Sequence, residues 1–160
     1  MKAQILEKCE ELITLLRQKR LKIATAESCT GGMVTAYITA ISGASQVFEL
    51  GVTSYSNDIK NKFLKVDSKT LETFGAVSHN TAKEMAENVR LLSGADIGIS
   101  VTGVAGPDSQ EGHKPGTVFI AYSDKNGTQS KRLDIPPESR DFVREQTVLQ
   151  LFNTVIENIK

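Results

Sequence analysis

Apolar positions recur along the chain with two different periods, which predict where helices and strands lie. Near the N-terminus the apolar residues fall at helical spacing, at Ile5, Cys9, Leu12, Ile13 and Leu16. This spacing predicts an amphipathic helix that ends near Lys19. Residues 22–26 are a short apolar run of strand length, so we expect a buried strand there.

The same patterns predict the remaining elements. We expect helices over about 30–40, 57–64, from near 68, from 78 to Gly94 and over about 139–159, and strands over 47–55, 97–101, 117–123 and 128–135. Asn126-Gly127 is a strong turn signal and predicts a hairpin between the last two strands. Helices and strands alternate before that hairpin, without a repeat or a linker. The pattern therefore predicts one α/β domain over 1–160, an α/β/α sandwich whose mixed sheet combines parallel strands with the hairpin.

Composition narrows the classes of function. The chain has 160 residues, with 19 Lys and Arg against 19 Asp and Glu. A formal net charge of zero argues against a broad surface for nucleic acid or an anionic membrane. The charged N-terminal segment lacks the apolar core of a signal peptide, and no run approaches the roughly 20 apolar residues that span a bilayer. We therefore expect a soluble cytoplasmic protein with no nucleic-acid or membrane partner.

Polar sequences follow three of the predicted strands at the point where each strand ends. They are E-S-C-T-G-G at 27–32, Y-S-N at 55–57 and T-G-V-A-G-P at 102–107. In open α/β sheets, ligands bind beyond the carboxyl ends of the strands. If these three strands are parallel, their polar ends share one rim, and this convergence is the strongest functional signal in the pattern.

Ser28 lies on the first of these strand-to-helix turns. Backbone N–H groups at such a turn can stabilise an oxyanion or hold a phosphate, and glycines let the backbone approach a ligand closely. Ser28 or Thr30 could instead simply cap the following helix. The pattern matches neither the phosphate-binding P-loop nor the G-x-S-x-G elbow, so spacing alone leaves both interpretations open.

Cys29 is the rival nucleophile. A thiol at a helix start has a lowered pKa when it faces solvent, but a free cysteine is also common in protein cores. Neither histidine is a convincing partner, because His79 lies at a predicted helix start and His113 in a loop. The two cysteines form no CxxC or Cys/His cluster, so no zinc site is expected.

A serine nucleophile without histidine needs another base, and serine–lysine pairs are a known arrangement. Lys60 lies on the first turns of a predicted helix, where the helix dipole and burial would both lower the pKa of its amine. A lysine at such a position is, however, ordinarily a solvated surface residue.

Arg140 begins the last predicted helix, where a cation is unfavourable, and this indicates an anionic partner. Pairing with Asp141 or Glu138 explains Arg140 equally well. Asp108 and Glu111, two acids in one glycine-rich loop, are too weak a pattern to predict a metal ion.

Five ordered motifs together resemble one family. They are T-A-E-S-C-T-G-G at 25–32, G-V-T-S-Y-S-N-D-I-K at 51–60, G-A-V-S at 75–78, T-G-V-A-G-P-D at 102–108 and K-P-G-T-V at 114–118. The chain, from about Leu21 to its C-terminal helix, resembles the CinA C-terminal domain family, the nicotinamide-nucleotide amidases. The resemblance implies hydrolysis of the carboxamide of nicotinamide mononucleotide to nicotinic acid mononucleotide and ammonia, as a step of NAD salvage.

The resemblance also implies a role for each matching residue. Ser28 is the expected nucleophile and Lys60 its base, with Tyr55 close by. The expected substrate contacts come from the turn after Ser28, from the 102–107 loop and from an arginine that meets the phosphate, which together are Cys29, Thr30, Gly31, Gly32, Thr102, Gly103, Ala105, Gly106 and Arg140. No metal and no organic cofactor is implied. Family members often form oligomers, so we expect a homo-oligomer.

Two other functions remain open at this point. One is a pyridine-nucleotide-binding module without catalysis, and the other is an amidase of the same mechanism that acts on another carboxamide. The chain also departs from the family pattern in two places. K-P-G-T-V is one residue shorter than the commoner K-P-V-G-T-V, and Pro136-Pro137 replaces a glycine-containing approach to Arg140. The N-terminal domain that many relatives carry, linked to nucleotide pyrophosphatase chemistry, is not expected here.

Overall fold

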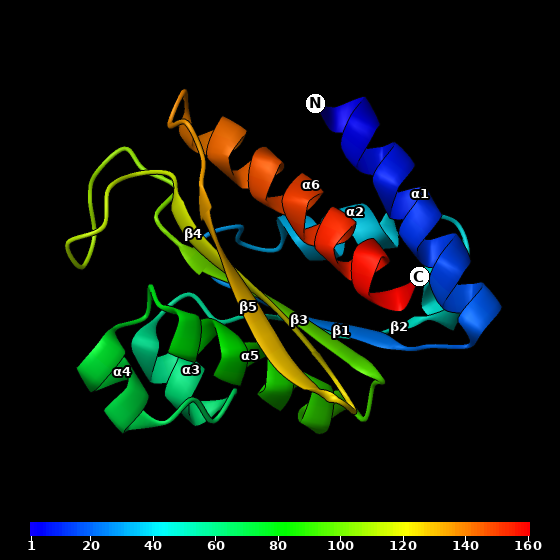
Figure 1. The fold of residues 1–160 in the computed structure, drawn as a ribbon, viewed down its shortest axis with the longest axis horizontal. Helices are drawn as coiled ribbons and strands as arrows, with labels where there is room; N and C mark the ends of the chain where they lie inside the picture. The colour runs from blue at the N-terminus through cyan, green and yellow to red at the C-terminus, as the bar shows by residue number, and fades with distance from the viewer.

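A five-stranded sheet in the order β2-β1-β3-β4-β5 runs through the centre of the molecule (Figure 1). The computed structural model describes residues 1–160. The strands are β1 (Ile23–Glu27), β2 (Phe48–Thr53), β3 (Ile97–Gly103), β4 (Thr117–Asp124) and β5 (Gly127–Asp134). β1 pairs in parallel with both β2 and β3, whereas β3, β4 and β5 pair antiparallel. The predicted mixed sheet is confirmed, and the three parallel strands end at one edge.

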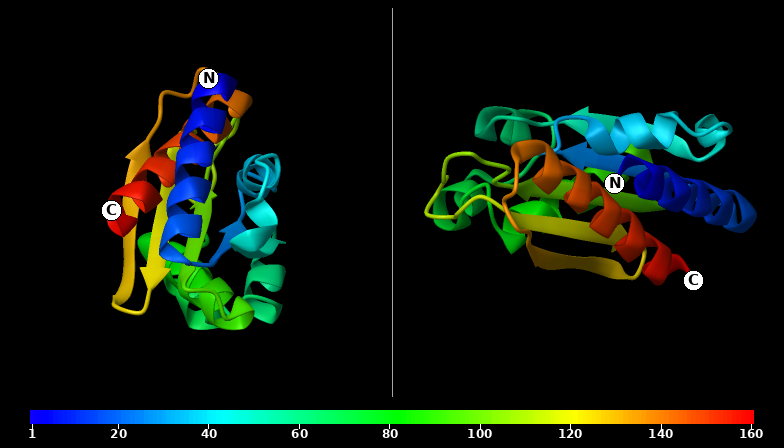
Figure 2. Two further views of the ribbon diagram at one scale, coloured as in Figure 1. Left: turned by 90° about the vertical axis from the view of Figure 1, so that its right-hand side faces the viewer. Right: turned by 90° about the horizontal axis from the view of Figure 1, so that it is seen from above.

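Helices cover both faces of this sheet. They are α1 (Lys2–Lys19), α2 (Met33–Thr39), α3 (Asn57–Lys62), α4 (Ser68–Phe74), α5 (His79–Ser93) and α6 (Arg140–Ile159), with a short 3-10 helix at Ala44–Gln46. α1, α2 and α6 lie on one face, and α3, α4 and α5 on the other (Figure 1). Figure 2 shows α1, α2 and α6 in front of the sheet in its right-hand view. None of the helices is both long and apolar enough to cross a bilayer.

The two faces of the sheet carry different cores. Side chains of α1 and α6, such as Leu12 and Phe152, form the larger core with Ile23 and Ile99 of the strands. On the opposite face small residues of the strands let α5 approach closely. Gly98 of β3 lies so near α5 that an added Cβ would overlap the Ala86 carbonyl oxygen. Because both faces are covered, β1 is buried along its whole length, as its continuous apolar run predicted.

The boundaries differ from the predicted ones mainly beside the polar strand ends. α2 begins at Met33 and not near Thr30, because Gly31 and Gly32 take positive φ values of 58° and 93° and form a turn before the helix. α3 ends at Lys62, before Leu64, because Lys65 turns the chain with a φ of 56°. β3 extends two residues beyond the predicted end, to Gly103.

The close contact between α5 and the sheet gives a stability prediction. Gly98→Ala should lower the free energy of unfolding by about 3 kcal/mol, because the methyl group overpacks a contact with helix backbone. Gly94→Ala is the control: Gly94 has a φ of +70° but no atom within 4 Å of an added Cβ, so only a left-handed backbone cost of about 1 kcal/mol applies. Urea denaturation measures both, and equal losses would contradict the close approach.

Candidate functional site

The carboxyl ends of the three parallel strands border a cavity of about 430 Å³. Residues after β1, after β2, at the end of β3 and at the start of α6 line it. The lining comprises Ser28, Cys29, Tyr55, Asn57, Lys60, Ala76, Val77, the segment 102–110 and Arg140. The predicted convergence of polar strand ends on one rim is therefore confirmed.

Lys60 is the least expected side chain in this cavity wall, because only 1% of it is exposed. Ser56 caps α3, its hydroxyl accepting from the Ile59 N–H at 3.2 Å, and this cap sets the start of the helix that carries Lys60. The Lys60 Nζ donates to the Ser28 Oγ at 2.9 Å and to the Ser54 carbonyl oxygen at 2.8 Å. Ser28 and Lys60 are thus in direct contact.

Burial governs the charge of this lysine. No carboxylate forms an ion pair with Lys60, so the loss of water around an ammonium is compensated only in part. Burial lowers the pKa of Lys60 to about 8, with smaller opposing contributions from Cys29 and Glu111. A usable fraction of neutral amine is then present near neutral pH, which is what a general base requires.

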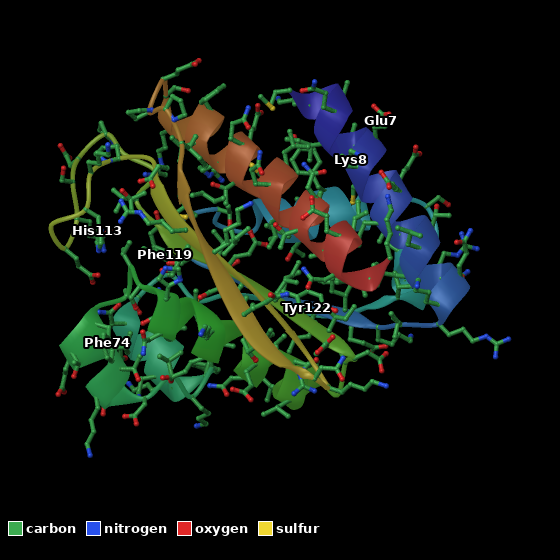
Figure 3. The ribbon with its side chains drawn as sticks, in the orientation of Figure 1. Glu7, Lys8, Phe74, His113, Phe119 and Tyr122 are labelled. Atoms are coloured by element: carbon green, nitrogen blue, oxygen red, sulfur yellow. The ribbon has the colours of Figure 1, made fainter.

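Cys29 lines the cavity beside Ser28 but lacks the properties of a nucleophile. Burial raises the pKa of its thiol to about 12, so the reactive thiolate is scarce. No imidazole serves it: His79 Nδ1 lies 2.8 Å from the Ser130 Oγ, and His113 packs edge-on against Phe119. Figure 3 shows His113 on the loop near Phe119. The geometry favours Ser28 over Cys29.

The turn after Ser28 is held by a residue that the sequence analysis did not single out. The buried Glu27 carboxylate accepts from the N–H groups of Gly32 and Val34 at 3.0 Å and of Thr35 at 2.8 Å. It therefore occupies the N-terminus of α2, where the helix dipole favours an anion. In the sequence, the signal for this role was the position of Glu27, an acid directly between a predicted strand and a helix start.

This arrangement changes the expected roles of three residues. Thr30, Gly31 and Gly32 lie outside the cavity lining, because Glu27 already takes the Gly32 N–H and Thr30 is fully buried. The interpretation that Ser28 or Thr30 caps the helix is also wrong: the N-cap of α2 is Gly32, and the Glu27 carboxylate takes the N–H groups at the helix start.

Several backbone donors at the cavity remain without a partner in the protein. The Ser28 N–H donates to the Val101 carbonyl oxygen, whereas the Cys29 N–H has no acceptor. Ala105 and Gly106 also line the cavity, and their N–H groups have no acceptor either. All three of these N–H groups thus belong to residues of the cavity lining and have no backbone acceptor.

Arg140 lies at the start of α6 and connects two parts of the rim. Its Nη1 donates to the Gly106 carbonyl oxygen at 2.6 Å, and its Nη2 donates to the Tyr55 hydroxyl oxygen at 2.8 Å. Asp141 pairs instead with Arg144, at 3.1 Å, so the interpretation of Arg140 as paired with a neighbouring acid is wrong. Arg140 brings an uncompensated positive charge to the cavity.

The loop after β3 supplies backbone more than side-chain chemistry. The buried Thr102 hydroxyl donates to the Ala76 carbonyl oxygen at 2.7 Å and so braces the neighbouring wall. Gly103 has no room for a side chain, since an added Cβ would lie 2.7 Å from the Thr117 carbonyl oxygen. Asp108 lines the cavity, but no group of three or more His, Cys, Asp or Glu side chains is placed to hold a metal ion.

Comparison with known families assigns this chain to one class. The sequence profile of the CinA C-terminal domain matches residues 6–159. The chain therefore belongs to the CinA C-terminal domain family, as the motif resemblance predicted.

Relatives by sequence carry names that describe a biological context. The chain is 47% identical over 147 residues to a competence-damage inducible protein of Thermoanaerobacter pseudethanolicus, covering 91% of this chain and 35% of that protein. It is 52% identical over 114 residues to a competence-damage inducible protein of Bacillus subtilis, covering 71% of this chain and 27% of that protein. The chain thus spans about a third of the length of the curated relatives it matches.

Solved structures share the whole fold. A CinA superfamily protein from Klebsiella pneumoniae has a TM-score of 0.94 and 29% identity, covering 97% of both chains. The competence/damage inducible protein CihA from Agrobacterium tumefaciens has a TM-score of 0.92 and 35% identity, covering 96% of this chain and 94% of that one.

The buried amine gives a pH prediction for stability. Lys60 has a pKa of about 8 in the folded protein against 10.5 for an ordinary lysine, so the unfolded chain binds more protons between these values. The free energy of unfolding should therefore rise with pH in this window, by about 2 kcal/mol between about pH 7 and about pH 9.5. Lys60→Met is the control and should lack this increment in urea denaturation. Equal pH dependence of the two proteins would show that the amine is not desolvated.

Proposed function

We propose that this protein hydrolyses the carboxamide of nicotinamide mononucleotide, releasing nicotinic acid mononucleotide and ammonia, by a serine–lysine mechanism. The observation that carries the proposal is the 2.9 Å contact between the Lys60 Nζ and the Ser28 Oγ inside the cavity. A non-catalytic binding module has no need of a buried lysine with a lowered pKa on a serine hydroxyl. Membership of the CinA C-terminal domain family supports the same conclusion.

Lys60 in its neutral form takes the proton of the Ser28 hydroxyl as the oxygen attacks the amide carbon. Its second contact, to the Ser54 carbonyl oxygen, fixes the direction of the amine. The Cys29 N–H, next to the nucleophile and without an acceptor in the protein, is placed to donate to the oxyanion that forms. The protonated Lys60 then gives its proton to the departing ammonia, and water hydrolyses the acyl-enzyme.

The rest of the rim fits the nucleotide portion of such a substrate. Arg140 carries a charge without a carboxylate partner, and its Nε makes no hydrogen bond in the protein. A phosphate would meet this guanidinium and the free N–H groups of Ala105 and Gly106. Tyr55, held by Arg140 and 61% exposed, offers an aromatic face at the mouth. No metal or organic cofactor enters any step, and we expect a cytoplasmic homo-oligomer that serves NAD salvage.

Ammonia release from nicotinamide mononucleotide tests the proposal. Ser28→Ala should lower kcat by about a thousandfold or more, because the nucleophile is lost, whereas Cys29→Ala should stay within a few-fold of wild type. Coupled detection of ammonia measures both variants beside the wild type. Loss of activity in Cys29→Ala with retention in Ser28→Ala would contradict the assignment of the nucleophile. Nucleotide binding by the wild type without ammonia release would favour a binding module or another carboxamide.

A further inference from the structure

The loop between β3 and β4, residues 104–116, forms one wall of the cavity and then folds back over α4 and the start of α5. Figure 1 shows this loop projecting beyond the end of the sheet above α4. Its first limb, 104–110, lines the cavity, and its tip and second limb do not. The tip nevertheless makes a specific contact with the opposite wall.

That contact is made by Glu111. Its Oε1 accepts from the Ala76 N–H at 3.1 Å, and its Oε2 accepts from the Val77 N–H at 2.9 Å. Ala76 and Val77 both line the cavity. Two charge-assisted hydrogen bonds therefore join the loop to the segment that it faces.

The backbone around Glu111 is shaped for this contact. Gln110 and His113 exchange both of their backbone hydrogen bonds, at 3.0 and 2.8 Å, and enclose a two-residue turn. Glu111 and Gly112 take positive φ values of 51° and 76°, as a type I′ turn requires. Asn is the favoured residue at the first of these positions, and a glutamate there costs about 1 kcal/mol or more. The type I′ turn alone therefore does not explain why a glutamate stands at position 111.

The facing segment accommodates the same side chain. At Gly75 an added Cβ would overlap the Glu111 carboxylate, so a glycine is needed for the approach. The other side of the segment is fixed by the Thr102 hydroxyl, which donates to the Ala76 carbonyl oxygen at 2.7 Å. Breaking the Glu111 contacts would therefore detach the tip of the loop from Ala76 and Val77, while Ala76 stays attached to the sheet and Arg140 still holds Gly106.

We propose that Glu111 is a positioning residue that holds the 104–110 wall closed against Ala76 and Val77, so that this wall is in place when substrate binds. Glu111 lies outside the cavity lining and touches no reacting atom, so apart from its small electrostatic effect on the pKa of Lys60 it acts through the loop. For turnover, the inference rests on the proposed function. For the closure itself it rests only on the contacts of Glu111.

Two substitutions at Glu111 distinguish the contacts of its carboxylate from its effect on the type I′ turn. Glu111→Gln keeps the size of the side chain but replaces one acceptor oxygen by an NH2 group that cannot accept. Glu111→Asn favours the type I′ turn but is too short to make both contacts. Glu87→Gln is the matched control, because Glu87 is an exposed acid on α5 that forms no hydrogen bond or ion pair.

Amide hydrogen exchange of the full chain without substrate, followed by NMR, measures the closure. Exchange at Ala76 and Val77 should become about tenfold faster in Glu111→Gln and Glu111→Asn and stay unchanged in Glu87→Gln. In the ammonia assay, KM for nicotinamide mononucleotide should rise about tenfold in both Glu111 variants, with a smaller change in kcat.

The outcomes distinguish this inference from the proposed function. Wild-type exchange rates at Ala76 and Val77 in Glu111→Gln, or restoration of wild-type KM in Glu111→Asn, would overturn the positioning role. Faster exchange in both Glu111 variants, with no ammonia release from nicotinamide mononucleotide by the wild type, would support the closure while overturning the proposed hydrolysis of this substrate.

Discussion

The site depends on one constraint, an amine buried without a carboxylate partner. Lys60 is 1% exposed and is held by the Ser28 hydroxyl and the Ser54 carbonyl oxygen. The parallel pairing of β1 with β2 creates this geometry, because the Ser54 N–H donates to the Glu27 carbonyl oxygen at 2.8 Å and so aligns the ends of the two strands. Burying an amine in this way lowers stability at neutral pH, and in return the protein holds a lysine whose pKa lies near the pH at which a base must work.

Other charged side chains hold the surrounding backbone in place. Glu27 fixes the turn that follows Ser28, and Arg144 donates to the Thr30 carbonyl oxygen of the same turn at 2.9 Å. Arg140 ties Tyr55 to the loop at Gly106, and Glu111 ties that loop to Ala76 and Val77. Backbone segments with many conformational options are thereby fixed by charge-assisted hydrogen bonds, which are stronger than neutral ones. The hydrogen-bond donors around the cavity are therefore held in place before a ligand binds.

The sequence predicted the fold well where periodicity and turn chemistry agreed. The hairpin between β4 and β5 and the Ser56 cap of α3 were both readable from local pattern, although the two turn residues are Lys125 and Asn126 and Gly127 already belongs to β5. The pairing of Ser28 with Lys60, 32 positions apart, was proposed because a serine without a histidine needs another base, and motif resemblance then assigned both roles, since no local pattern predicts the contact. Contacts such as those of Glu27 and Glu111 were not predicted. They join a side chain to backbone N–H groups, which every residue carries, so no pattern of residue types reveals the partner.

The pH dependence of covalent labelling at Ser28 tests the central claim most directly, because it needs no knowledge of the substrate. The wild-type protein would be treated with a fluorophosphonate and the labelled peptide identified by mass spectrometry, beside Lys60→Met. The account predicts labelling at Ser28 whose rate rises with pH with an apparent pKa of about 8, and little labelling in Lys60→Met. Equal labelling rates in the two proteins, or labelling at Cys29 instead of Ser28, would contradict it.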